Sequence, residues 1–140
     1  MQSRPALLGA ILAGGAVGTI GRYLLESVFP AAAGQWPWAT FTINVAGAFL
    51  LGVLLFALAR RGADTGSRRL LRLMLGTGVL GAFTTYSTFA VEVHALFGGG
   101  HLGTGMGYAL ASVATGVVAA AGGALLARRL VPARRAEPEA

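Results

Sequence analysis

The sequence predicts an all-α integral membrane protein with four transmembrane helices, and three observations support this class. Of the 140 residues, 55% are hydrophobic and only 11% are charged, whereas about a quarter of the residues of a soluble domain are charged. The hydrophobic residues form four long apolar runs, each long enough for the roughly 20 residues that cross a bilayer as a helix. The runs are rich in Gly and Ala, which suits close helix packing, and they lack the alternating period that a transmembrane barrel requires.

The predicted spans cover residues 6–28, 36–59, 70–97 and 102–127 and belong to a single membrane domain, residues 1–130. The segment 131–140 contains Pro, Arg and Glu and is predicted to be a disordered tail. A chain with so few spans is too small to enclose a transport path comfortably by itself, so we expect an oligomer.

Arginines are confined to one side of this arrangement, apart from Arg22. They precede the first span, flank the connection between the second and third, and follow the fourth, whereas the connections 29–35 and 98–101 contain neither Lys nor Arg. By the positive-inside rule both termini and the tail are cytoplasmic, in a cell (plasma) membrane that the chain crosses several times. The net charge of +6 therefore reflects topology and contact with lipid headgroups, and we expect no nucleic-acid partner.

The first span combines a track of glycines with a pair of charges. Arg22 and Glu26 are four residues apart, so they can pair with each other or with Glu92 of the third span. A structural ion pair is one role for Arg22, and the attraction of anions into an aqueous vestibule is another. The glycines let a neighbouring helix approach closely and are Gly14, Gly18 and Gly21.

Polar and small residues form one stripe on the second span and another on the fourth. Asn44 is the most demanding of them, because its amide has two donors and an acceptor that need partners away from bulk water. That requirement favours a role in lining a polar path. Ser112 and Thr115 have an alternative, since either hydroxyl can bond to the backbone of its own helix. The stripes consist of Thr40, Asn44, Gly47 and Ala48, and of Tyr108, Ser112, Thr115, Gly116 and Ala119.

The third span is too long for one straight helix across the bilayer. As a continuous helix, residues 70–97 would measure about 40 Å, against a hydrocarbon core of about 30 Å. Glycines and hydroxyl-bearing residues crowd its middle and weaken helical hydrogen bonding, so we predict an interruption near residues 81–85. Carbonyls freed at membrane depth can bind a cation, and a flexible hinge without an ion is the alternative. Tyr86 and Phe89 share the next helix face, either as core residues or as rings whose positive edges contact an anion.

The residue types argue against an enzyme. The chain has no cysteine and two histidines, which excludes disulfides, thiol catalysis and a zinc site of the usual composition. No activated nucleophile or acid–base pair is recognisable. Besides a channel, two functions are compatible with the sequence: a small multidrug exporter that exchanges protons at Glu26, and a structural membrane subunit without transport.

Three segments resemble, in order and spacing, the signatures of the Fluc family of small fluoride channels, also called CrcB. They are residues 18–23 (GTIGRY), 38–47 (WATFTINVAG) and 78–89 (GVLGAFTTYSTF). The resemblance implies a fluoride-selective channel that exports fluoride down its electrochemical gradient and so limits toxicity in the cytoplasm. It also implies an antiparallel dimer of four-helix subunits, and hence dual topology.

The resemblance further implies a structural sodium ion, which is not transported. Backbone carbonyls at the interruption of the third span would hold it at the dimer interface, and they correspond to Gly81 and Thr84. Tyr86 stands where the family usually has Phe, and Gly116 interrupts the polar track one turn beyond Ser112. The anion pathway of the family corresponds to Asn44, Tyr86, Phe89, Tyr108, Ser112 and Thr115.

In such a pore, hydroxyls and the Asn44 amide replace water around a small, strongly hydrated anion. The one-sided distribution of arginines conflicts with an antiparallel homodimer, because each chain would have to insert in both orientations. The partner is therefore either a second copy of this chain or, as we hypothesise, an oppositely oriented homologue with the reverse charge bias.

Overall fold

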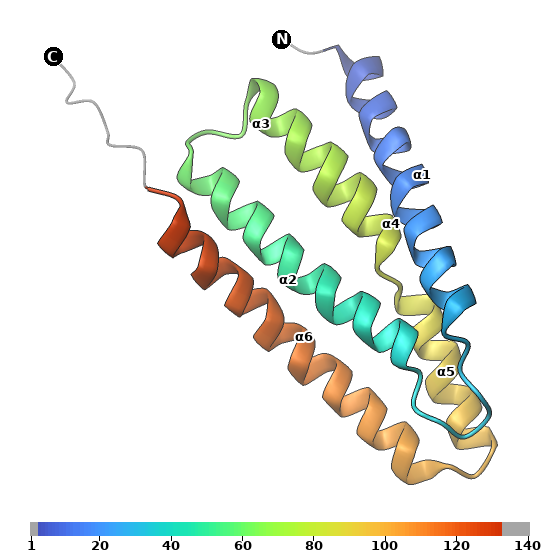
Figure 1. Cartoon of the computed structure of the whole chain (residues 1–140). Helices are drawn as coiled ribbons and strands as arrows, with labels where there is room; N and C mark the ends of the chain where they lie inside the picture. The colour runs from blue at the N-terminus through green and yellow to red at the C-terminus, as the bar shows by residue number, and fades with distance from the viewer. Residues whose placement is uncertain (1–2, 133–140) are drawn as a thin grey trace, which may run out of the picture.

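The computed structural model describes residues 3–132, which form a helical bundle without strands (Figure 1). The predicted all-α class is confirmed, and most of the predicted tail, 131–140, lies outside the described residues. In chain order the elements are α1 (Arg4–Val28), α2 (Trp38–Arg60), α3 (Gly66–Leu71), the π-helix η1 (Arg72–Leu80), α4 (Gly81–Phe83), α5 (Tyr86–Gly98) and α6 (Leu102–Leu130).

Three helices correspond to predicted spans. α1, α2 and α6 are each long and apolar enough to cross a membrane. Pro5 lies in the first turn of α1, where a missing backbone N–H removes no helical hydrogen bond. Large apolar side chains such as Leu12 and Val118 are about 70% exposed on these helices, as expected where the surroundings are lipid rather than water.

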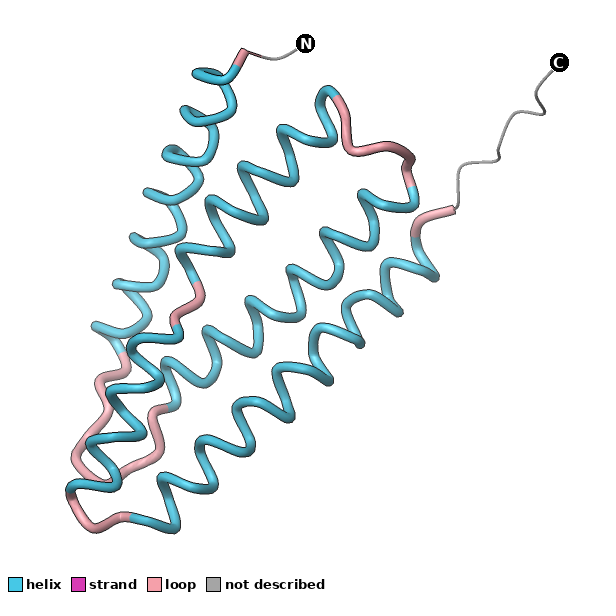
Figure 2. Tube along the Cα trace, turned by 180° about the vertical axis from the view of Figure 1, so that it is seen from behind, coloured by secondary structure: helices cyan, strands magenta, loops and turns pink. Residues whose placement is uncertain are grey.

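The third predicted span is segmented. α3, η1 and α4 run into one another, and the backbone is then extended at Thr84 (ψ 154°) and Thr85 (φ −144°) before α5 begins. Figure 2 shows this interruption as a short loop between two helical stretches. The interruption predicted near residues 81–85 is therefore confirmed.

Glycines determine how closely the helices approach. Gly14 and Gly18 are buried in α1, and a Cβ on Gly18 would overlap the carbonyl oxygen of Val79 in η1. α6 approaches α2 in the same way, since a Cβ on Gly123 would overlap the carbonyl oxygen of Phe49. The bundle therefore has two closely packed parts. In one, α1 packs against η1 and α4, and in the other, α2 packs against α6.

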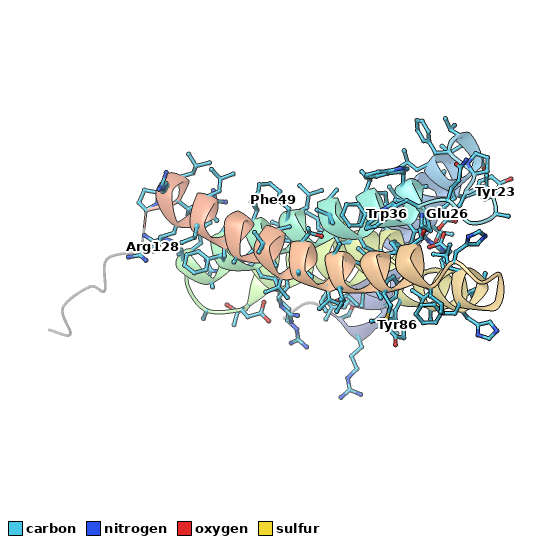
Figure 3. All side chains as sticks on the ribbon, turned by 90° about the horizontal axis from the view of Figure 1, so that it is seen from below. Tyr23, Glu26, Trp36, Phe49, Tyr86 and Arg128 are labelled. Carbon is cyan, nitrogen blue, oxygen red and sulfur yellow. The ribbon has the colours of Figure 1, made fainter. Side chains whose placement is uncertain are left out.

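The described arginines gather at one end of the bundle, with the exception of Arg22. The start of α1, the loop between α2 and α3 and the end of α6 all lie at this end (Figure 1). Figure 3 shows Arg128 at this end, whereas Tyr23 and Glu26 lie at the other. The side of the membrane that each end faces stays a prediction.

Candidate functional site

A side chain from α2 holds the interruption. Asn44 Nδ2 donates to the carbonyl oxygen of Thr85 (2.9 Å), and the Thr85 N–H donates to Asn44 Oδ1 (2.8 Å). One amide thus satisfies both backbone groups of a residue that lies outside any helix and is only 8% exposed. Because an unpaired backbone group at membrane depth is very costly, this reciprocal pair of hydrogen bonds is what permits the interruption.

Thr85 also acts as the N-cap of α5. As a result, the carbonyl oxygens of Gly81 and Thr84 do not receive the hydrogen bonds that they would have in a continuous helix. Thr85 Oγ1 accepts a hydrogen bond from the N–H of Thr88 (3.1 Å). In a continuous helix the Gly81 oxygen would accept from Thr85, and the Thr84 oxygen from Thr88, but both N–H groups donate elsewhere. The carbonyls of Gly81 and Thr84 have therefore lost their helical donors.

These two carbonyls are the ones that the family resemblance implies as ligands of a cation, and that role stays a prediction. Unwound backbone carbonyls at half-helix ends are oxygen ligands of the kind that hold sodium in membrane proteins. Within residues 3–132, no group of three or more His, Asp or Glu side chains is placed to hold a metal ion. A cation at the interruption would accordingly depend on backbone oxygens such as those of Gly81 and Thr84.

Arg22 braces the end of α4 from the neighbouring helix α1. Its Nε donates to the carbonyl oxygen of Ala82 (3.2 Å), and its Nη1 lies 3.7 Å from Glu26 Oε1. Of the two roles predicted for Arg22, the structural one is thus present in the fold. The Arg22 side chain is 27% exposed, so part of it can be reached from outside the bundle. Its role in attracting anions into a vestibule stays a prediction.

A pocket of about 310 Å³ opens beside the interruption and the first turn of α5. The ring of Phe89 forms part of its wall, with its centroid 6.0 Å from that of Tyr86 and 5.2 Å from that of Tyr108. Tyr86 is 81% exposed and projects outward from α5 (Figure 3). The pocket is lined by Asn44, Thr84, Thr85, Tyr86, Phe89, Ser112 and Val113.

The two hydroxyls predicted on the fourth span have different surroundings. Thr115 Oγ1 donates to the carbonyl oxygen of Ala111 (2.6 Å) on its own helix, and Thr115 is exposed. Ser112 Oγ lies at the pocket, is buried, and has no hydrogen-bond partner among the described residues. A buried polar group without a partner costs about 1–3 kcal/mol, so Ser112 Oγ is an unsatisfied polar atom in the wall of this pocket.

Glu92 lies in a cluster that the sequence analysis missed. The alternative in which it pairs with Arg22 or Glu26 is wrong, because Glu92 accepts from Thr40 Oγ1 at Oε1 and from the Tyr108 hydroxyl at Oε2, both at 2.7 Å. Thr40 and Tyr108 are 1% and 0% exposed. The cluster therefore joins α2, α5 and α6, and the position of Thr40 one turn before Asn44 was the available signal.

The structure brings four of the six predicted pathway residues to one pocket and leaves two outside it. Tyr108 contacts Phe89, but its hydroxyl is engaged by Glu92. Thr115 lies on the outer surface of α6. Thr84, Thr85 and Val113 line the pocket without having been predicted as pathway residues. The four residues that share the pocket are Asn44, Tyr86, Phe89 and Ser112.

Comparison with known proteins finds one family. Residues 9–124 match the family described as CrcB-like protein, Camphor Resistance (CrcB). The chain is 48% identical over 138 residues to "Fluoride-specific ion channel FluC 2" of Leifsonia xyli subsp. xyli, covering 95% of this chain and 93% of that protein. It is 42% identical over 120 residues to "Fluoride-specific ion channel FluC 1" of Cutibacterium acnes (86% and 84% covered). It is 43% identical over 121 residues to "Fluoride-specific ion channel FluC" of Caulobacter vibrioides (86% and 94% covered).

Replacement of Asn44 is expected to loosen the interruption. In Asn44→Ala both backbone groups of Thr85 lose their partner, and each unsatisfied group costs about 1–3 kcal/mol. The Thr85 amide should therefore exchange with deuterium about tenfold faster or more, measured on the purified protein in detergent. The control is Ser27→Ala, which removes a hydroxyl that bonds only to its own helix, at the Tyr23 carbonyl. Equal exchange in the two variants would show that Asn44 does not hold the interruption.

Proposed function

The chain belongs to the CrcB family, and we propose that it is a fluoride channel of the cell membrane. The family consists of fluoride ion channels and not of enzymes. Together with the long apolar helices, this membership makes the chain a multi-pass membrane protein. We propose four crossings, the fourth being the segmented stretch from α3 to α5.

The observation that carries the proposal is the unpartnered Ser112 hydroxyl in the pocket beside the interruption. Other groups at the pocket favour an anion as well. Asn44 uses one of its two amide hydrogens on Thr85 and keeps the other. The rings of Tyr86 and Phe89 have positive edges, and the first N–H groups of α5 have no carbonyl acceptor within their helix, which places partial positive charge at its start.

Selectivity follows from the exchange of water for these groups. A small, strongly hydrated anion must shed water to pass, and it does so only where short-range donors replace that water. The Ser112 hydroxyl and the free Asn44 N–H are such donors. The rings of Tyr86 and Phe89 line the path with apolar surface that does not hold water. Fluoride, as the smallest halide, gains most from donors at close range.

The direction of transport follows from the electrical gradient. A pore supplies no energy, so fluoride moves down its electrochemical gradient. A membrane potential that is negative inside drives an anion outward, at about 2.3 kcal/mol per elementary charge per 100 mV. We propose that this export limits the toxicity of fluoride in the cytoplasm.

We further propose that Na⁺ binds at the interruption as a structural ion and is not transported. The support is that the carbonyls of Gly81 and Thr84 have both lost their helical donors. The ion would supply positive charge between the half-helices that meet there. The same two carbonyls of a second subunit would add further oxygen ligands around the ion.

A dimer is proposed because the pocket is incomplete on one side. Its lining comes from α2, α5 and α6 and from the interruption, and Tyr86 remains 81% exposed, so a second subunit is needed to enclose the ring. We propose an antiparallel arrangement with an oppositely oriented homologue rather than with a second copy. The support is that, within residues 3–132, every arginine except Arg22 lies at one end of the bundle, which favours one orientation with cytoplasmic termini.

The other two functions compatible with the sequence have no such support. Glu26, the proton-exchanging residue of a multidrug exporter, lies in the last turn of α1 beside Arg22. The relatives reported above are named as fluoride channels rather than as exporters. A structural subunit without transport is distinguished by the absence of ion flux.

Fluoride efflux from liposomes that contain this chain together with its proposed partner, the oppositely oriented homologue, tests the proposed function. Ser112→Ala is expected to lower the efflux about tenfold or more, because a hydrogen bond to a charged group contributes about 1.5–3 kcal/mol. Efflux is followed with a fluoride electrode, and chloride serves as the control ion. Ser27→Ala is the matched control, since its hydroxyl serves only its own helix. Equal fluoride flux in the two variants, or chloride flux as large as fluoride flux, would refute selection at this pocket.

Sodium is expected to raise the thermal stability of the purified dimer of this chain with its proposed partner. A bound ion stabilises the fold by about 2.7 kcal/mol at a hundred times its dissociation constant. The melting temperature should therefore rise with Na⁺ at constant ionic strength and not with Cs⁺, while a Na⁺ gradient should not drive fluoride flux. Identical melting temperatures in the two salts would argue against the ion.

Orientation in the membrane distinguishes the two kinds of dimer. If the partner is an oppositely oriented homologue, the chain expressed alone should expose a C-terminal tag on the cytoplasmic side only and should give no flux by itself. Flux should then appear on co-expression with a homologue of reversed charge bias. Tags accessible from both sides together with flux from this chain alone would establish the homodimer instead.

A further inference from the structure

A groove of about 160 Å³ lies at the arginine-rich end of the bundle, between the end of α2 and the start of the segmented span. Leu55, Leu58 and Ala59 of α2 supply an apolar floor, and the rest of the lining consists of Gly62, Asp64, Arg68 and Arg72. None of the residues that line the pocket at the interruption belongs to it. The groove therefore combines an apolar surface with positive charge at a separate place in the fold.

Hydrogen bonds fix both guanidinium groups of the lining. Arg72 donates to the carboxylate of Asp64 through Nε (3.0 Å) and Nη2 (2.7 Å). This hydrogen bonding lowers the pKa of Asp64, so the carboxylate stays ionised at neutral pH and keeps Arg72 in place. Arg68 Nε donates to the carbonyl oxygen of Ala63 (2.8 Å). Its other four donors, on the two Nη atoms, bond to no acceptor within the described part of the chain.

The charge around the groove is strongly positive. Among the described residues, Asp64 is the only carboxylate at this end of the bundle, since Glu26 lies at the other end (Figure 3) and Glu92 belongs to α5, which lies toward that other end (Figure 1). An anion that reaches the groove is therefore attracted by many positive charges, most of which no carboxylate neutralises. The arginines at this end are Arg4, Arg60, Arg61, Arg68, Arg69, Arg72, Arg128 and Arg129.

We propose that this groove binds the phosphate and glycerol of an anionic phospholipid such as phosphatidylglycerol. The ends of membrane-spanning helices lie at the depth of the lipid headgroups, and the free Nη groups of Arg68 match a phosphate in charge and geometry. The groove has room for about five water molecules at ~30 Å³ each, which suits a phosphoglycerol group rather than a whole lipid. Leu55 is 43% exposed and continues the apolar floor toward the bilayer core, where the acyl chains lie.

Charge complementarity and the apolar floor together identify the occupant. A soluble phosphate would use the arginines but leave the floor of Leu55 and Leu58 without a partner. A zwitterionic lipid such as phosphatidylcholine also carries a phosphate, but its headgroup cation would be repelled by the surrounding arginines. The inference depends only on the position of this end at the headgroups, so it holds whichever ion the pore conducts.

Spin-labelled lipids in vesicles test the site. The full chain is reconstituted in phosphatidylcholine, and the fraction of labelled phosphatidylglycerol immobilised by the protein is compared with that of labelled phosphatidylcholine. Arg68→Gln is expected to lower the selectivity for phosphatidylglycerol roughly fivefold, the effect of about one arginine–headgroup contact. Arg68→Lys, which retains the charge, should recover part of it.

Arg69→Gln is the matched control, because Arg69 is the neighbouring arginine on α3 and does not line the groove. Equal loss of selectivity in Arg68→Gln and Arg69→Gln would show a diffuse surface charge and overturn the proposal. Displacement of the labelled phosphatidylglycerol by soluble glycerol phosphate would overturn the choice of a lipid. Unchanged selectivity in a correctly folded Arg68→Gln would overturn the site itself.

Discussion

The rest of the site depends on one constraint, that backbone groups exposed by a broken helix at membrane depth must find partners inside the protein. The Asn44 amide meets this requirement by bonding to both backbone groups of Thr85. The position of Asn44 on α2 decides where α5 begins, and therefore in which direction Tyr86 and Phe89 point. The same bonds withdraw the helical donor from the Gly81 carbonyl, so the oxygens proposed for a cation and the rings proposed for an anion depend on the same side chain.

α2 holds the half-helix α5 at two points. Thr40 and Asn44 are one turn apart on α2. Asn44 bonds to Thr85 at the start of α5, and Thr40 bonds to Glu92 about two turns further along it. Phe89 lies between these two points and packs on Tyr108 of α6. Its position is therefore set by the hydrogen bonds from α2 to α5 and by the contact with α6. The Thr40 and Tyr108 hydroxyls are both engaged by Glu92, whereas Ser112 Oγ at the pocket bonds to no group among the described residues.

Local features of the sequence predicted what depends on local chemistry. Apolar runs predicted the spans, and the glycines and threonines after Leu75 predicted the interruption, because both signals are contained within one segment of the chain. The partners of Glu92 were not predictable in this way, since Thr40 is 52 residues away and reaches it only when the helices pack. Ser112 and Thr115 have the same local chemistry, and only the rotation of α6 against α2 and α5 separates the hydroxyl at the pocket from the one that bonds to its own helix.

The concentration of arginine at one end links the orientation of the chain to its lipid surroundings. Lipid that binds between Arg68 and the apolar floor of α2 occupies only the leaflet that the arginine-rich end faces. A second copy in antiparallel orientation would place the same groove in the opposite leaflet, where the positive-inside rule disfavours so many arginines. An oppositely oriented homologue avoids this conflict, because its own basic residues would lie at the end that faces the cytoplasm. The charge pattern that favours one orientation therefore also confines the lipid groove to one side of the membrane, and the two sides of the assembled channel would differ even though its two halves share one fold.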